Sequence, residues 1–404
     1  MIATVVGVRV LQQDESPPSE PATASASAAE RRFTRIGTTD GEPLSDGEVD
    51  QLSTGYGYVL FTKFHAGWDI EAHHADTRRL NAARRDVRVF PYFSTKYWFE
   101  RNEWGVELDP DWLLRDNEGE LVPKLRGGEE QDDGRFIDLA NPDYRDWALE
   151  VIASWLEAAP YAGVSFDAAD PIGDNDPEEI ERWTALIGPE RIAAYNEGIR
   201  DLLDRAGDLV GPDGEVIYNG IAPNPIRGTG RDLDLLEVAD GALDEKFCID
   251  RKGEPLAIDE DLALMADVED DRLFLRTNLP EGLSPEDRDR LRRLCVGTFL
   301  LGWVPGRTFF QIGDTYTTDQ LVAENAPEVE VDVGRPTGPA EGTTVRTRPF
   351  ANGLIVVNLG GSPATFEMPS PLSAMEGGRT ADRYEAGASV TIDPLDALLL
   401  VTPR

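Results

Sequence analysis

The sequence predicts an α/β protein in which a (β/α)8 barrel is followed by a small C-terminal antiparallel β-sandwich. Two observations predict this fold. Between residues 57 and 311, short apolar strands alternate with amphipathic helices, which is the pattern of parallel βα units. After Pro327, short strands are separated by turns such as Asn352-Gly353, and no helical period appears. We therefore expect the barrel over residues 32–326 and the sandwich over 327–404.

The first 31 residues predict a mobile tail. Residues 12–30 are rich in proline, serine, alanine and glutamate, so they carry too little apolar surface to order themselves. Barrel strands follow at eight places: 58–62, 87–94, 136–139, 163–167, 215–219, 239–245, 273–277 and 308–311. Helices are expected at about 70–85, 141–160, 189–206, 233–238, 258–268 and 284–302, with Asn141 and Ser284 as caps of the second and the last. Strands of the sandwich are expected at 343–348, 354–359, 365–368, 389–392 and 397–401.

The composition excludes several partners. The formal net charge is -37, only five lysines occur, and the acidic residues are spread over the whole chain. Such a surface is typical of proteins from high-salt surroundings, where screening weakens self-repulsion. We therefore expect the barrel to lose its fold in low salt and regain it in molar salt. No basic stripe exists for nucleic acid or anionic membranes, and no apolar run reaches membrane-spanning length.

Cysteine and histidine patterns indicate no metal or cofactor site. Cys248 and Cys295 lie in apolar surroundings, so we expect two small core residues and no disulfide. The histidines at 65, 73 and 74 form no metal-binding spacing. An apolar patch at residues 2–10 lacks a preceding basic residue, so the pattern indicates a secretory signal only weakly. Cytoplasmic and secreted locations both stay open, as does the oligomeric state.

The stretch from 161 to 170 is central to the functional prediction, because it reads as a buried strand that ends in Asp167. In βα barrels the carboxyl ends of the strands carry the chemistry. The alternative is that Asp167 merely caps the next loop or helix. Other polar residues at or just past strand ends complete a candidate barrel mouth: Lys63, His65, Tyr92, Ser94, Asp138, Asn219, Asp244, Glu245, Arg276, Asn278 and Gln311.

Carboxylates on the fourth and sixth strands would face each other across the mouth. That arrangement suits glycosidic bond cleavage, in which one carboxylate attacks or stabilises the sugar cation and the other protonates the leaving oxygen. Strand parity leaves Asp244 and Glu245 open, since only one of these neighbours points inward. Trp98, with the tryptophans at 68 and 104, offers a flat face for sugar rings; the alternative is that each is a core residue.

Several motifs resemble the glycoside hydrolases of the α-galactosidase-like superfamily, which includes the endo-polygalactosaminidase-like families. The resemblance covers roughly residues 57–311 and rests on the segments 112–119, 137–145, 163–167, 218–220 and 239–245. It implies a nucleophile at Asp167 and an acid/base at Glu245. The run Asp167-Ala-Ala169 is also similar to the α-amylase superfamily. However, Ser165 stands where that family has arginine, and the seventh strand lacks its His-Asp pair, so amylase is the weaker match.

These observations predict a glycoside hydrolase acting on a polysaccharide or glycoconjugate. Asp167 would be the nucleophile or charge stabiliser and Glu245 the proton donor, with Tyr92, Asp138 and Asn219 holding sugar hydroxyls. The alternative is a catalytically silent carbohydrate-binding barrel. The C-terminal segment carries few aromatics, so we expect it to be a structural companion of the barrel and not a separate sugar-binding module.

Overall fold

The computed structural model describes most of the chain. The described ranges are 28–37, 42–62, 70–99, 109–126, 129–172, 177–221, 233–250, 252–268, 270–313, 328–376 and 379–403. Residues 1–27 of the predicted tail over 1–31 therefore lie outside the described residues. Its last four residues form a 3-10 helix, η1 (Ala28–Arg31), and not a tail, because the Arg31 guanidinium is buried and donates to the carbonyl of Val331.

The centre of the molecule is a set of parallel strands in barrel order. They are β1 (Phe33–Ile36), β2 (Tyr58–Phe61), β3 (Arg88–Phe90), β4 (Tyr92–Ser94), β8 (Gly163–Asp167), β9 (Glu215–Asn219), β10 (Gly241–Asp244), β11 (Arg272–Asn278) and β12 (Thr308–Gly313). Strands β1-β2-β3 form one sheet, and β4-β8-β9-β10-β11-β12 form the other. Because β3 and β4 are one strand interrupted at Pro91, which has no N–H to give a ladder, the two sheets occupy eight strand positions.

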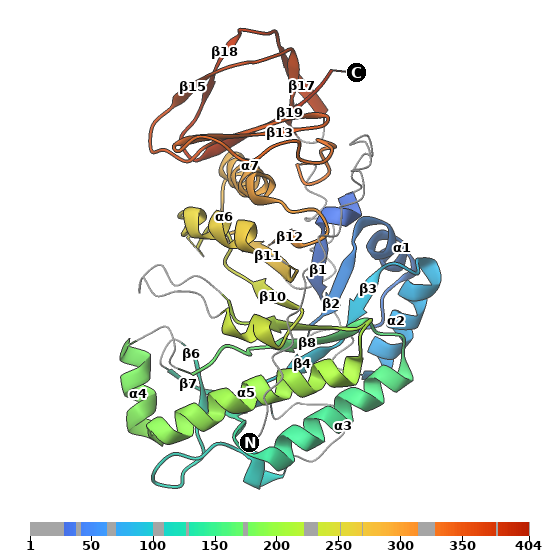
Figure 1. Ribbon diagram of the computed structural model, residues 1–404, viewed down its shortest axis with the longest axis vertical. Helices are drawn as coiled ribbons and strands as arrows, with labels where there is room; N and C mark the ends of the chain where they lie inside the picture. The colour runs from blue at the N-terminus through green and yellow to red at the C-terminus, as the bar shows by residue number, and fades with distance from the viewer. Residues whose placement is uncertain are drawn as a thin grey trace, which may run out of the picture.

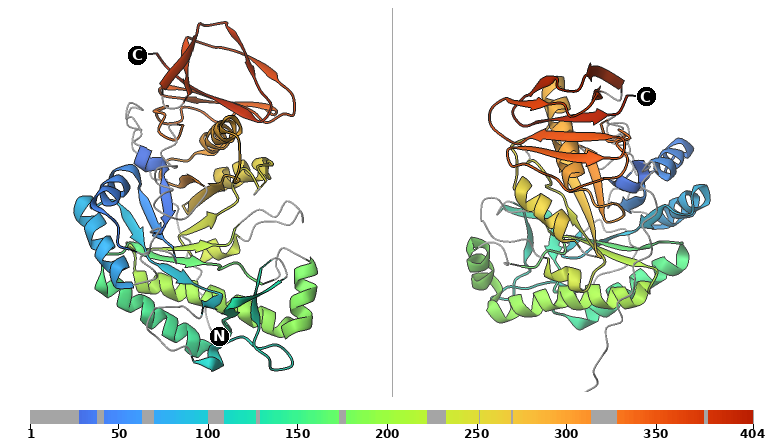
Figure 2. Two further views of the ribbon diagram at one scale, coloured as in Figure 1. Left: turned by 180° about the vertical axis from the view of Figure 1, so that it is seen from behind. Right: turned by 45° about the horizontal axis from the view of Figure 1, so that its top comes forward.

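The two sheets approach each other again at their far edges. Arg32, just before β1, forms a parallel bridge with Phe310 of β12. The described hydrogen bonds therefore make two arcs that meet at Pro91 and at this bridge, and not one continuous ladder around a closed barrel. Figures 1 and 2 show the arcs flanked by helices on the outside.

Two strand predictions were wrong, and their errors cancel. The first barrel strand is β1, which the sequence analysis did not identify. The segment 136–139 is not a barrel strand. Instead β7 (Glu129–Phe136) pairs antiparallel with β5 (Tyr97–Phe99) and β6 (Pro123–Arg126) in an excursion after β4. As a result, β8 and β10 still stand fourth and sixth.

Helices cover the outside of the strands. They are α1 (Asp46–Gly55), α2 (Ile70–Ala83), α3 (Pro142–Ala158), α4 (Pro177–Ile187), α5 (Pro189–Val210), α6 (Ile258–Asp267) and α7 (Pro285–Gly302), with 3-10 turns η3 (Pro110–Trp112) and η4 (Asp234–Glu237). The predicted caps are confirmed: Asn141 accepts from the amide of Asp143 at α3, and Ser284 from that of Asp287 at α7. Helices α1 and α4 were not predicted. Within the described residues, no helix is both long and apolar enough to cross a membrane.

The interior between the arcs is filled at its amino-terminal end. One cluster of buried apolar side chains contains Phe33, Tyr58, Leu60, Phe90, Ile217, Leu243, Phe274 and Phe309. All the parallel strand positions except β8 contribute a side chain to this cluster, and Ala162, directly before β8, packs against it. The packed plug therefore lies below the carboxyl ends of the strands. Because Leu243 belongs to this plug, the face of β10 that carries Leu243 points inward, and Glu245 follows on the same face.

The cysteine prediction was wrong. Cys248 and Cys295 form a disulfide, with Cα atoms 5.6 Å apart. Both residues are fully buried, which agrees with the predicted core position, but no local pattern indicates that the loop after β10 packs against α7. The bond therefore ties the segment just after Glu245 to that helix.

The C-terminal strands form two antiparallel sheets, which fits a β-sandwich. The order β13-β14-β19-β16-β17 makes one sheet and β15-β18 the other. The strands are β13 (Val345–Phe350), β14 (Gly353–Asn358), β15 (Ala364–Glu367), β16 (Leu372–Glu376), β17 (Arg379–Tyr384), β18 (Ser389–Ile392) and β19 (Asp396–Val401). The pair β16 and β17 was not predicted.

Helix α7 lies between this sheet and the barrel strands (Figure 1). Gly297 allows close packing, since a Cβ there would meet the Ala397 side chain at 2.7 Å. Arg293 makes two hydrogen bonds with the Asp396 carboxylate, at 2.9 and 2.7 Å. The Arg348 guanidinium donates to the carbonyls of Leu300, Leu301 and Trp303 at the end of α7, where helix carbonyls run out of intrahelical donors. These contacts join the C-terminal sheets firmly to the barrel.

Candidate active site

Asp167 ends β8 at the carboxyl edge of the strands. Three side chains donate to its carboxylate. Tyr92 Oη lies 3.0 Å from Oδ2, while Asn219 Nδ2 and an Arg35 nitrogen each lie 2.7 Å from Oδ1. The next residue, Ala168, has a φ of 53°, a region that alanine rarely adopts. The chain thus turns sharply directly after Asp167, which fixes where its carboxylate points.

Glu245 comes directly after β10. Its Oε1 lies 2.5 Å from the other Arg35 nitrogen, and its Oε2 lies 3.0 Å from Asn219 Nδ2. Asn278 of β11 donates to the backbone carbonyl of Glu245 at 2.8 Å, which holds the turn after the strand. Asp244 is fully buried, and its Oδ1 accepts from the Lys246 amide at 2.7 Å. Of the two neighbouring acids, Glu245 is therefore the one that contacts the Asp167 group.

The two carboxylates lie close together, because they share donors. One Asp167 oxygen is 2.7 Å and one Glu245 oxygen 3.0 Å from the same Asn219 nitrogen, so these oxygens cannot be farther apart than about 5.7 Å. The side chains of Asp167 and Glu245 are 22% and 25% exposed, whereas that of Arg35 is 7% exposed. Two carboxylates thus reach solvent above a buried guanidinium.

Arg35 is the site residue that the sequence analysis missed. It lies in β1, a four-residue strand in which all positions are buried. The sequence Phe-Thr-Arg-Ile contains a charged residue where a barrel strand is normally apolar, and the ion pairs with the carboxylates of β8 and β10 explain its burial. An arginine inside a short apolar stretch was the available signal.

A second layer of polar side chains holds Arg35 from below. Gln311 of β12 accepts from the Arg35 amide at 3.2 Å and donates to its carbonyl at 3.4 Å. Arg276 of β11 is fully buried and donates to Gln311 at 3.2 Å and to Asn278 at 2.8 Å. Arg276 therefore lies beneath the carboxylates and supports their neighbours.

Tyr92 keeps its proton in this site. Burial raises the pKa of the Tyr92 phenol well above its usual value, and the Asp167 charge raises it further, while Arg35 acts in the opposite direction. The hydroxyl therefore donates to Asp167 over the whole physiological pH range. A donated hydrogen bond favours the charged form of a carboxylate.

The remaining predicted site residues lie elsewhere. Asp138 follows β7, where it accepts from the Ala140 amide at 3.1 Å and lies 3.4 Å from Arg191 of α5. Trp98 is part of β5 and packs against the main hydrophobic core while partly buried. Lys63, His65 and the tryptophans at 68 and 104 lie outside the described residues. Of the predicted residues, Tyr92 and Asn219 thus contact the carboxylates of the two acids, and Arg276, Asn278 and Gln311 lie in the layer that supports them.

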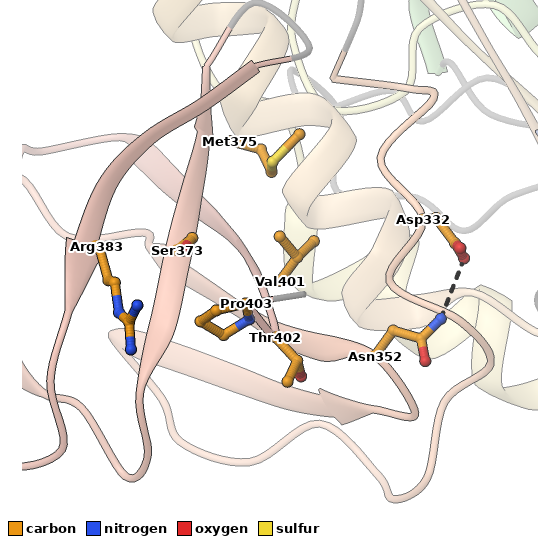
Figure 3. Close-up of a pocket in the computed structure, with 8 residues that line it drawn as sticks. All are labelled: Asp332, Asn352, Ser373, Met375, Arg383, Val401, Thr402 and Pro403. Atoms are coloured by element: carbon orange, nitrogen blue, oxygen red, sulfur yellow. Dashed lines mark hydrogen bonds between the residues drawn. The ribbon is translucent and has the colours of Figure 1, made fainter.

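A cavity of about 660 Å³ lies in the C-terminal sheets (Figure 3). The described residues that line it are Asp332, Asn352, Ser373, Met375, Arg383, Val401, Thr402 and Pro403. Asn352 donates to Asp332 at 3.3 Å across one side. None of these lining residues is aromatic, so the cavity offers no flat face for a sugar ring.

Solved structures share the fold. An enzyme described as a family GH13_31 enzyme is 10% identical with a TM-score of 0.55, and the match covers 93% of this chain and 99% of that one. The noncanonic maltogenic alpha-amylase AmyB from Thermotoga neapolitana is 12% identical with a TM-score of 0.52, over 93% and 99% of the two chains. An alpha-amylase from Geobacillus thermoleovorans, complexed with acarbose, is 10% identical with a TM-score of 0.50, over 93% and 98%.

These neighbours are glycoside hydrolases. At such low identity the likeness establishes the shared fold and leaves the activity to be argued from the site. No protein-family model matches the sequence, and neither does any curated protein sequence.

Proposed function

We propose that this protein is a glycoside hydrolase that cleaves a polysaccharide or glycoconjugate, with Asp167 as nucleophile and Glu245 as proton donor. One observation carries the proposal: two partly exposed carboxylates at the ends of the fourth and sixth strands share the Asn219 amide and the Arg35 guanidinium. Paired carboxylates at this edge of a barrel are what glycosidic cleavage requires.

The donors support different roles for the two acids. Asp167 accepts hydrogen bonds on both oxygens, from Tyr92, Asn219 and Arg35, and these favour a charged nucleophile. Glu245 follows the apolar Leu243 on the inward face of β10, and apolar surroundings favour the protonated form that a proton donor needs. In the first step the Asp167 carboxylate would form an ester with the anomeric carbon, while Glu245 gives its proton to the leaving oxygen.

The spacing of the acids favours retention of anomeric configuration. Retaining enzymes hold their carboxyl groups about 5–5.5 Å apart, and inverting enzymes about 6.5–9.5 Å apart. The two oxygens that share the Asn219 nitrogen are at most about 5.7 Å apart, which is below the inverting range and supports the retaining class. Water would then cleave the ester, with Glu245 taking its proton.

Other side chains are proposed to bind the sugar or to support the pair. Tyr92 and Asn219 lie against the acids, where they can also reach a hydroxyl of the bound ring. Arg276 and Asp244 are fully buried, so we assign them to support of the strand ends and not to direct contact. Asp138, Trp98 and Lys63 remain candidates for outer positions of a carbohydrate chain.

One experiment tests the proposal. The full-length protein is incubated in molar salt with a panel of aryl glycosides and soluble polysaccharides, and released aglycone and reducing ends are measured. Hydrolysis of a panel member that disappears in Asp167→Asn and persists in Arg88→Gln, a substitution at the opposite end of the strands, is the expected result. Glycan binding without hydrolysis in the wild type would contradict it.

That second outcome describes a catalytically silent carbohydrate-binding barrel. One observation favours this candidate: Arg35 contacts Glu245 at 2.5 Å, and a guanidinium favours the charged carboxylate over the protonated one that a proton donor needs. Retention of a glycan on an affinity column by a protein that cleaves none of the panel would select it.

A further inference from the structure

We infer that Arg35 is a positioning residue that holds the Asp167–Glu245 pair at its catalytic spacing and balances the single negative charge that passes between the two acids. The inference rests on the proposed function. It begins from an unusual arrangement, in which one buried arginine from the first strand contacts both acids from the fourth and sixth strands.

The guanidinium fork makes one contact with each acid. One terminal nitrogen lies 2.7 Å from Asp167 Oδ1 and the other 2.5 Å from Glu245 Oε1. The two nitrogens of a guanidinium are fixed in one plane, so a fork that holds both oxygens also sets the distance between them. A lysine ammonium, which is a single point of charge, could not impose that spacing.

The arginine itself has little freedom to move. Its side chain is 7% exposed, and its amide and carbonyl are both bonded to the Gln311 side chain. Gln311 is in turn held by Arg276, which is fully buried. Strands β1, β11 and β12 therefore position the fork, while the more exposed acids face the solvent above it.

The charge of Arg35 matches the proposed reaction. Before the first step Asp167 is a carboxylate and Glu245 holds a proton, so the pair carries one negative charge. Asp167 then forms a C–O bond to the anomeric carbon as the bond to the leaving oxygen breaks, and that oxygen takes the Glu245 proton. Asp167 is now a neutral ester and Glu245 a carboxylate. The pair again carries one negative charge, and the same guanidinium contacts both positions.

Two uncharged side chains of the described residues also contact the pair. Tyr92 from β4 donates to Asp167 as a neutral phenol, and Asn219 from β9 donates to both acids without charge. The nearest loops after β4 and β8 carry Lys96 and Asp170, whose Nζ and Oδ2 are 2.7 Å apart and largely offset each other. Arg35 thus supplies the cation in direct contact with the two carboxylates.

The test compares Arg35→Gln and Arg35→Lys with the wild type. Glutamine keeps hydrogen-bond donors without charge, and lysine keeps charge without the fork. Arg88→Gln is the matched control, because Arg88 pairs with another buried carboxylate, that of Glu215, at the far end of the strands. The first readout needs no substrate: side-chain carboxyl carbons of Asp and Glu are labelled with ¹³C and titrated, and the pair is assigned from Asp167→Asn and Glu245→Gln spectra.

Removing a cation from contact with a carboxylate raises its titration midpoint by about 1–3 pH units. We expect both steps of the pair to move up by about one unit or more in Arg35→Gln, less in Arg35→Lys, and not at all in Arg88→Gln. The second readout is the pH profile of kcat/KM, in which both limbs should shift upward in Arg35→Gln. The same shift is absent for a residue that merely stabilises the fold.

The two proposals fail separately. Unchanged carboxyl titration in folded Arg35→Gln overturns the role of Arg35, whatever the activity. Shifted titration in a protein that hydrolyses no glycoside keeps the electrostatic role and overturns the proposed function. If Arg35→Gln does not fold, the carboxyl titration of Arg35→Lys is the deciding measurement. Its two carboxyl groups should still titrate at higher pH than those of the wild type. Unchanged midpoints in Arg35→Lys contradict the inference.

Discussion

The two ends of the parallel strands carry opposite versions of one ionic cluster. At the carboxyl end, two acids share one arginine, and both acids are partly exposed. At the amino end, two arginines share one acid: Glu215 lies 2.8 Å from Arg272 and 3.2 Å from Arg88, is 4% exposed, and accepts from Tyr58 at 3.3 Å. With all of these side chains ionised, the first cluster has one excess negative charge and the second one excess positive charge; with Glu245 protonated, as the proposed reaction requires, the first cluster is neutral.

This difference separates a candidate reaction site from a structural one. The amino-end acid is enclosed by its partners and by the aromatic plug that includes Tyr58, so almost none of its carboxylate faces solvent. The acids at the carboxyl end keep open faces above a buried cation. A strained backbone, such as the positive φ of Ala168, beside exposed carboxylates is what a functional site is expected to show.

The largest expected effect is on turnover at the carboxyl end. Asp167→Asn and Glu245→Gln should each lower kcat by about 10²–10⁴-fold, because each removes a nucleophile or proton donor while keeping the side-chain size. The measurement is kcat on the best substrate of the glycoside panel, with melting temperature as the control for folding. Near-normal turnover in either variant removes that residue from the mechanism, and loss in Asp244→Asn alone would show that the wrong neighbour was assigned.

The next largest effect concerns the loop that follows Glu245. Replacing both Cys248 and Cys295 with alanine should lower the free energy of unfolding by about 2–4 kcal/mol, as expected for loss of a native disulfide. Denaturant unfolding under non-reducing conditions measures it. Because the bond ties the loop after Glu245 to α7, kcat should fall as well. A mass spectrum of the unreduced wild type that shows two free thiols would contradict the premise.

A smaller effect is expected at the amino end. Arg272→Ala leaves the buried Glu215 with one guanidinium, which should cost about 1–3 kcal/mol of stability without changing kcat. Burial raises the pKa of Glu215 above its ordinary value of 4.5, and loss of Arg272 raises it further. A raised carboxyl pKa gives stability that is present below 4.5 and lost as pH rises, so the deficit should grow from pH 4 to pH 7.

Chemical denaturation at several pH values checks that trend. The control is Arg205→Ala, which breaks a more exposed pair with Asp146 and should cost at most about 1 kcal/mol. A deficit for Arg272→Ala that is constant with pH would mean that Glu215 does not feel the arginine.

The smallest effect concerns Tyr92. Since burial raises its pKa, the phenol contributes stability that is present below its ordinary value of 10.0 and lost at higher pH. The wild type should therefore lose about 1 kcal/mol more than Tyr92→Phe between pH 9 and pH 11. Parallel stability curves for the two proteins would show that the phenol titrates normally.

Much of the fold followed from local patterns. Alternating βα units, the caps at Asn141 and Ser284, and the turns of the last 60 or so residues depend on nearby side chains, which the sequence displays directly. The position of Asp167 at the end of the fourth strand was also predicted correctly. The count of four was right because the missed strand β1 and the wrongly predicted strand at 136–139 cancel. The predicted requirement for salt stays a prediction.

The rest depended on contacts between distant residues. Arg35 and β1 are buried because acids more than 100 residues away accept from the guanidinium, and no local pattern announces that. The disulfide requires α7 to lie against the loop after β10. The antiparallel excursion with β7 lies beside β5 and β6 and only resembles a barrel strand in sequence.

One measurement tests the central claim, that Asp167 and Glu245 form the catalytic pair of a retaining glycosidase. The wild-type protein is incubated with a panel of 2-deoxy-2-fluoroglycosyl fluorides, which form a glycosyl ester that hydrolyses slowly, and is then digested and analysed by mass spectrometry. The account predicts a gain of one fluorosugar on the peptide that contains Asp167, and no gain in Asp167→Asn. A label on any other carboxylate, or hydrolysis of a natural glycoside with inverted configuration, would contradict it.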